Sequence, residues 1–197
     1  SNKKIKDENQ ILIAPSWNYK ENNFFDNCLD KTINVLTNSK FNLIVRPHPE
    51  HFKRSAKIIN KIKKKYKNSN SLIFDEHFDN LHSMETSNIL ITDNSTIAIE
   101  YALIFYRKVI YIVFEDKIHN SDYFKIDNST LEDNFKNNFG TIINYKNVDQ
   151  LPEICNSINK EDNTEYVKKI DDFKKSNFYN LNRTVLNATN YLINNLQ

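Results

Sequence analysis

The residues with the clearest chemical potential stand in ILITDNSTIAIEYALIFYRKVIYI, Ile89–Ile112. An apolar strand is predicted to run into Asp93 and then into a polar cap, Asn94, Ser95 and Thr96, that opens a helix. A helix start binds anions, because its unpaired N–H groups and the helix dipole both favour negative charge. The same side chains also serve as ordinary helix caps. The pattern nevertheless predicts a site for a phosphorylated ligand.

A second candidate set stands in RPHP, which follows the apolar residues at Leu43–Val45. His48 lies between two prolines that restrict the backbone, so we expect it to donate to a phosphate or to shuttle a proton. A turn histidine without chemistry is the alternative. The guanidinium of Arg46 could bind a phosphate or carboxylate through two parallel N–H donors, and a surface salt bridge is the alternative. Both residues are predicted to be catalytic.

Three further residues are predicted to bind substrate. Glu100 falls four residues after Thr96, where a carboxylate suits ribose hydroxyls, although an exposed helix charge is the plain alternative. Trp17 either stacks on a base or packs within the protein. Ser16 is polar and directly follows a strand and Pro15.

The alternation of strands and helices predicts the fold. Apolar runs predict strands at Gln10–Ala14, Phe41–Val45, Ser71–Phe74, Asn88–Thr92, Val109–Val113 and Thr141–Ile143. Helical spacing predicts helices at Phe25–Leu36, Lys53–Tyr66, Asn80–Glu85, Thr96–Phe105, Val148–Ile158, Thr164–Lys175 and Leu181–Leu196. This order implies an α/β fold with a doubly wound, mostly parallel sheet covered on both faces.

In such sheets ligands bind beyond the carboxyl ends of the strands. Polar residues follow five of the predicted strands: Ser16 and Trp17, Arg46 and His48, Asp75 and Glu76, Asp93–Thr96, and Glu115–His119. The polar segment Glu115–Asn138 is expected to be an irregular, mobile loop. We expect a disordered tag or linker at 1–9, a nucleotide-binding domain at 10–160, and helices packed on that domain at 161–197.

Composition excludes several classes of protein. Gly140 is the only glycine, so neither a P-loop nor a GxGxxG turn can be built. A net charge of +2 argues against nucleic acid as a partner. Cys28 and Cys155 are expected to be reduced, packed thiols. The histidines show no metal-ligand spacing, and we expect neither a metal nor a cofactor. A cytoplasmic location is expected.

Taken together, APSW at Ala14–Trp17, RPHP at Arg46–Pro49 and TDNSTIAIEYA at Thr92–Ala102 resemble the CDP-glycerol glycerophosphotransferase family. These enzymes are the teichoic-acid and capsule polymerases of bacterial envelopes. The resemblance covers about Ile11 to Val113. It implies one Rossmann-like half of a GT-B fold, the half that binds the donor nucleotide.

The resemblance also implies roles for single residues. His48 would contact the donor phosphates, Asp93, Ser95 and Thr96 would form a phosphate cradle, and Glu100 would bind ribose. The family's general base sits in the other domain and has no counterpart here.

The expected function is therefore donor binding in a transferase of cell-surface polymer synthesis, with CDP-glycerol or a sugar nucleotide as donor. The expected partners are an N-terminal acceptor domain outside this chain and, peripherally, the inner face of the membrane. A sugar-nucleotide glycosyltransferase, a UDP-sugar 2-epimerase-like domain and a non-enzymatic flavodoxin-like binding domain stand as alternatives. A receiver domain is disfavoured, because Pro15 and Ser16 stand where its acidic cluster would be.

Overall fold

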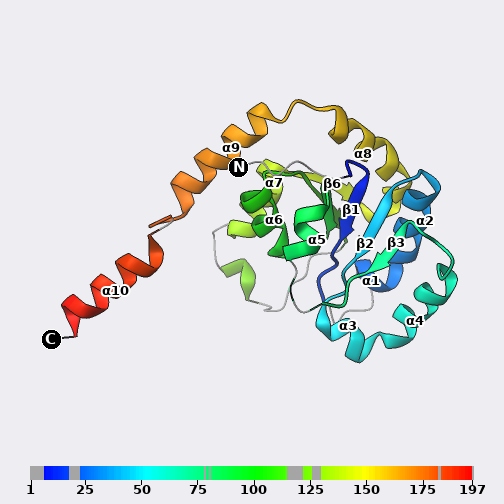
Figure 1. Cartoon of the computed structure of the whole chain (residues 1–197), viewed down its shortest axis with the longest axis horizontal. Coiled ribbons are helices and arrows are strands. Elements are labelled where there is room, and N and C mark those ends of the chain that lie inside the picture. Colours follow the sequence, from blue (N-terminus) through cyan, green and yellow to red (C-terminus); the bar gives the residue numbers. More distant parts are fainter. Residues whose placement is uncertain are drawn as a thin grey trace. The chain divides into compact units, whose positions relative to one another are not determined.

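The computed structural model describes residues 7–17, 23–77, 79, 81–114, 122–125, 130–181 and 183–196. In this part of the chain six strands form one parallel sheet with the order β3-β2-β1-β4-β5-β6 (Figure 1). The strands are β1 Gln10–Ile13, β2 Asn42–Val45, β3 Leu72–Phe74, β4 Ile89–Thr92, β5 Val109–Val113 and β6 Gly140–Asn144. The predicted α/β, doubly wound, Rossmann-like fold is confirmed.

Helices connect the strands. Those before β4 are α1 Phe24–Asn27, α2 Leu29–Asn38, α3 Pro49–Arg54, α4 Ala56–Lys65 and α5 Leu81–Thr86. Those after β4 are α6 Ile97–Phe105, α7 Leu131–Phe139, α8 Leu151–Lys160, α9 Thr164–Asn177 and α10 Thr184–Asn195, with the 3-10 helices η1 Tyr123–Lys125 and η2 Tyr145–Gln150.

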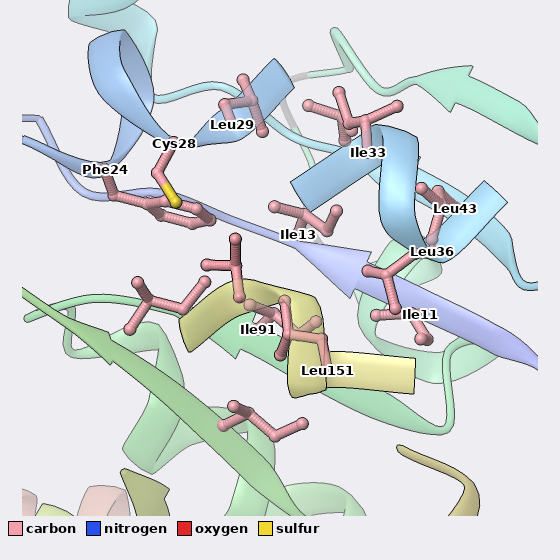
Figure 2. Close-up of a cluster of buried hydrophobic side chains, with 14 of the residues drawn as sticks. Ile11, Ile13, Phe24, Cys28, Leu29, Ile33, Leu36, Leu43, Ile91 and Leu151 are labelled. Atoms are coloured by element: carbon pink, nitrogen blue, oxygen red, sulfur yellow. The ribbon is translucent and has the colours of Figure 1, made fainter. Parts of the chain in front are cut away.

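The hydrophobic core explains why these segments pack as layers. Alternate strand residues such as Ile11, Ile13 and Ile91 point to one face of the sheet, where apolar side chains of α2 and Leu151 of α8 cover them (Figure 2). Helices α5 and α6 contact the central strands β1, β4 and β5. The central strand β4 is buried at every position, which suits a strand covered on both faces.

Two predicted helices are each broken into two. Cys28 (φ −128°) separates α1 from α2, and Ser55 (φ −120°) separates α3 from α4. Both helices of each pair bury side chains: Phe24 and Phe25 in α1, Leu29, Ile33 and Leu36 in α2, His51 in α3, and Ile59 and Ile62 in α4, so buried residues stand on both sides of each break. Hydrophobic periodicity therefore could not locate them.

The prediction of an irregular loop over Glu115–Asn138 is wrong at its C-terminal end. Helix α7 forms there, because Thr130 caps it by accepting from the N–H of Asp133 and because Phe135 is buried. Phe135 also stacks on Phe139, with ring centroids 4.7 Å apart. The predicted strand-end residues Glu115–His119 lie outside the described residues.

Gly140 joins α7 to β6 with ordinary extended geometry, φ −94° and ψ 148°. A Cβ atom at this position would overlap the ring of Tyr111 on β5 and lie 2.8 Å from the carbonyl oxygen of Lys136. Glycine is therefore needed here for space rather than for backbone freedom. The close approach fixes the end of α7 against the sheet.

The chain divides into two compact units, residues 1–161 and 162–197. The first holds the sheet, and the second holds α9 and α10. The predicted packing of the C-terminal helices on the first domain, and the predicted linker at 1–9, stay predictions. Among the described residues, no helix is long and apolar enough to cross a membrane.

Candidate functional site

The strand order places a topological switch point between β1 and β4. Crossovers on the two sides of this point run in opposite directions, which leaves a crevice beyond the carboxyl ends of the two strands, where ligands bind in open α/β sheets. Ser16 follows β1 and Asp93 follows β4. The N–H of Ser16 donates to Oδ1 of Asp93 at 2.7 Å, and its hydroxyl donates to Oδ2 at 2.9 Å. The structure therefore brings together two predicted site residues that stand 77 positions apart in the sequence.

A further hydrogen bond joins the ends of β4 and β1 next to the pair formed by Ser16 and Asp93. The hydroxyl of Thr92, fully buried at the end of β4, donates to the carbonyl oxygen of Ala14 at 2.6 Å. Both carboxylate oxygens of Asp93 accept hydrogen bonds from Ser16, in the loop after β1. This arrangement gives Asp93 a positioning role, because it ties the β1 loop to the turn that opens α6.

The turn from Asp93 to α6 has the features of an anion site. Thr96 is the N-cap, and no side chain caps the helix. Among the described residues, none accepts from the N–H of Asn94, Thr96 or Ile97, whereas the N–H of Ser95 bonds to the carbonyl of Asp93. The alternative reading of these residues as ordinary side-chain caps is therefore not what the structure shows at this helix. Unpaired N–H groups and two adjacent hydroxyls favour a bound anion.

Arg46 follows β2 and is engaged by the protein itself. Its Nη1 lies 2.6 Å from Oδ2 of Asp75, the residue after β3, and 3.2 Å from the carbonyl oxygen of Asp79. The side chains of Arg46 and Asp75 are only 17% and 7% exposed. This is the salt-bridge alternative foreseen from the sequence, although the pair is buried more deeply than a surface bridge.

Asp75 stays charged in this setting. Burial raises the pKa of its carboxyl group, but hydrogen bonds from Ser83, from the N–H of His77 and from Arg46 outweigh burial and hold the pKa below its usual range. Asp75 therefore acts as a fixed anion that orients the Arg46 guanidinium at the carboxyl edge of the sheet.

His48 is exposed at the N-cap of α3, and its Nδ1 accepts from the N–H of Glu50 at 3.2 Å. In the neutral ring the proton then sits on Nε2, so Nε2 is the donor. The N–H of His48 in turn donates to Nδ1 of His51 at 3.1 Å. His51 is 2% exposed and stacks on Phe25 with ring centroids 3.7 Å apart, and this buried ring fixes the His48 backbone.

The remaining predicted site residues lie at the same edge or just after it. Trp17 is half-buried, with the guanidinium carbon of Arg54 5.4 Å from its ring centroid. Asn94 is exposed, and its Oδ1 accepts from Nζ of Lys136 at 3.3 Å. Glu100 is exposed on the first turn of α6.

Sequence reasoning missed His51 and Lys136. His51 carried a usable signal, since a residue three positions after an N-cap can complete a capping box. Lys136 stands in the segment expected to be a loop. Among the described residues, no cluster of three or more His, Cys, Asp or Glu residues is suited to a metal ion.

The family model of the CDP-Glycerol:Poly(glycerophosphate) glycerophosphotransferases matches residues 3–184. None of the curated proteins is a significant match. Two solved structures of the wall teichoic acid polymerase TagF, one of them soaked with CDPG, are similar at TM-score 0.50 with 18% and 19% identity. The two matches cover 84% and 89% of this chain, but only 35% and 39% of the TagF chains.

The glycotransferase of kitacinnamycin is similar at TM-score 0.53 with 8% identity, over 88% of this chain and 40% of its own. At these identities the likeness shows a common fold. This chain spans well under half the length of the solved proteins that it resembles.

Proposed function

The chain belongs to the CDP-Glycerol:Poly(glycerophosphate) glycerophosphotransferase family, and from this premise we propose that it is the donor-nucleotide-binding part of a transferase for cell-surface polymer synthesis. The observation that carries the proposal is the anion-ready turn at the β1–β4 switch point. There Asp93 is held by Ser16 while the N–H groups of Thr96 and Ile97 remain without acceptors among the described residues.

Six of the predicted residues have a direct role toward the donor in this proposal. The hydroxyls of Ser95 and Thr96 and the start of α6 receive a donor phosphate. Nε2 of His48 donates to the same diphosphate, and Arg46 adds positive charge from its pair with Asp75. Glu100, one turn into α6, accepts from ribose hydroxyls, and Trp17 stacks on the base.

The proposed reaction is the attack of an acceptor hydroxyl on the donor phosphate next to glycerol. A new P–O bond forms, the bond to the nucleotide phosphate breaks, and the nucleoside monophosphate leaves with that electron pair. The hydroxyl proton passes to a general base that we place in an acceptor domain outside this chain. His48, Arg46 and the α6 start stabilise the charge of the transition state.

The proposal extends to the setting of the whole protein. We propose that an acceptor domain completes the site and that the full enzyme works in the cytoplasm at the inner face of the membrane. We expect this chain alone to bind nucleotide without turnover, because the acceptor side of the site is supplied elsewhere.

Calorimetric titration tests the proposal directly. CDP-glycerol, CMP, UDP and UDP-sugars are titrated into the purified chain, and CDP-glycerol is expected to bind more tightly than any UDP-sugar. Tighter binding of a UDP-sugar would replace the glycerophosphate donor with a sugar nucleotide. Absence of binding by every nucleotide would contradict a donor-binding role.

A further inference from the structure

Helix α7 brings a cation to the anion-ready turn. Nζ of Lys136 lies 3.3 Å from Oδ1 of Asn94, although the two residues are 42 positions apart. The Lys136 side chain is only 16% exposed, so its ammonium group is held beside the turn rather than extended into water. We propose that Lys136 is a phosphate-binding residue of this site, one that adds its positive charge to the N–H groups at the start of α6.

The geometry of the crossover explains how Lys136 reaches that edge. Helix α7 leads into β6, so it runs antiparallel to the strands and its N-terminal end faces their carboxyl edge. Side chains on a helix lean toward its N-terminus. The Lys136 stem therefore runs toward the turn that follows β4.

Helix α7 is also well anchored, which makes the position of the ammonium group reproducible. Phe135, the neighbour of Lys136, is fully buried. The contact of Gly140 with Tyr111 fixes the other end of the helix, close to the carbonyl oxygen of Lys136. A cation on such a support loses little further freedom when it meets a ligand.

The present partners of the ammonium group leave it capacity for a phosphate. Asn94 accepts from it and Asp133 lies 3.3 Å away, which accounts for two of its three N–H donors. Asp133 is half exposed, and its other oxygen accepts from the hydroxyl of Thr130 at 2.8 Å. This acid is thus committed mainly to the start of α7.

The charge balance at the turn favours the same role. The carboxylate of Asp93 accepts from both donors of Ser16, and Lys136 brings a cation into contact with the next residue of this turn, Asn94. A diphosphate at the start of α6 adds negative charge close to Asp93. The N-terminal end of a helix carries only about half a positive charge, which is too little to offset this repulsion alone. A cation from α7 supplies the remaining positive charge.

This inference rests on the proposed nucleotide site, and CDP is the probe that tests it. Lys136→Gln is expected to weaken CDP binding about tenfold, the usual effect of losing one charge-assisted hydrogen bond, and to reduce its dependence on salt. Lys136→Arg should recover most of the affinity because it keeps the charge. Thermal unfolding should change little in either variant.

Lys108 supplies a matched control. It lies just before β5, at the opposite edge of the sheet, is 21% exposed and pairs with Glu161 at 3.1 Å. Lys108→Gln removes the same charge and is expected to leave CDP binding unchanged. Equal losses in the Lys108 and Lys136 variants would reduce the effect to net charge and overturn the inference.

The remaining outcomes separate this inference from the proposed function. If the wild-type chain binds CDP and Lys136→Gln binds it equally well, Lys136 is not part of the site while the proposed function stands. If the wild-type chain does not bind CDP, both fall. Should Lys136→Gln fail to fold, Lys136→Arg and Asp133→Asn carry the test. Asp133→Asn is expected to strengthen CDP binding about twofold, since it removes a competing anion, and an unchanged affinity in this variant would overturn the inference.

Discussion

The two sides of the carboxyl edge of this sheet differ in how their polar groups are paired. On the β2–β3 side, the guanidinium of Arg46 is bound by Asp75, and Nδ1 of His48 is used in the cap of α3. On the β4 side, the turn before α6 keeps N–H groups without acceptors among the described residues. On the first side the cation and the histidine are already held by internal pairs, whereas the second side keeps backbone donors without such pairs. Arg46 therefore supports the fold in addition to the binding role proposed for it, whereas the role proposed for the turn before α6 is binding.

The largest effect is expected where the internal pairs are broken. Arg46→Ala leaves the buried Asp75 carboxylate without its cation and should lower the free energy of unfolding by about 2–3 kcal/mol. For a chain of this size that corresponds to a fall of about 5–10 °C in melting temperature. Arg54→Ala, at a side chain that is 66% exposed, is the control and should cost less than about 1 kcal/mol. An Arg46 variant as stable as the control would mean that the pair does not support the fold.

The next effect concerns ligand recognition on the β4 side. If Glu100 binds ribose hydroxyls, Glu100→Gln should weaken CDP by about 1.5–3 kcal/mol and weaken its 2′-deoxy analogue less. Melting temperature should stay nearly constant, because an exposed helix carboxylate contributes little. Calorimetric titration of both ligands measures the difference. Equal losses for the two would remove Glu100 from the site.

Ser95→Ala sharpens the comparison within the turn. The hydroxyl has no partner among the described residues, so its removal should leave thermal stability unchanged. Affinity for CDP and for deoxy-CDP should fall alike, by about 1 kcal/mol, because the hydroxyl is assigned to phosphate. A loss of stability with unchanged affinity would assign Ser95 to the fold instead.

The smallest effect is the acid response of the β2–β3 side. Because the folded-state pKa of Asp75 is depressed, its ionised form stabilises the protein above the ordinary aspartate pKa of about 3.9, and this contribution is lost as pH falls below that value. Urea unfolding between neutral and acid pH should show a shallower decline in Asp75→Asn than in the wild type. Parallel curves would mean that other carboxylates govern the acid response.

The sequence predicted the sheet better than it predicted the site. Each apolar strand is marked by its own residues, and β5 was placed at its observed bounds, Val109–Val113. Parallel strands share an edge, so the meeting of Ser16 with Asp93 followed in outline. The commitment of Arg46 to Asp75, and the reach of Lys136 to Asn94, depend on the packing of helices and side chains, which local patterns do not encode.

The close fit of Gly140 against Tyr111 has a consequence for mutational scanning. The backbone there has angles that any residue adopts, so a survey based on φ would class the position as tolerant. A side chain of any size would instead collide with an aromatic ring and a carbonyl oxygen, and the collision would move the helix that carries Lys136. In a library of single variants, this glycine should therefore group with the phosphate-binding residues, although it touches no ligand.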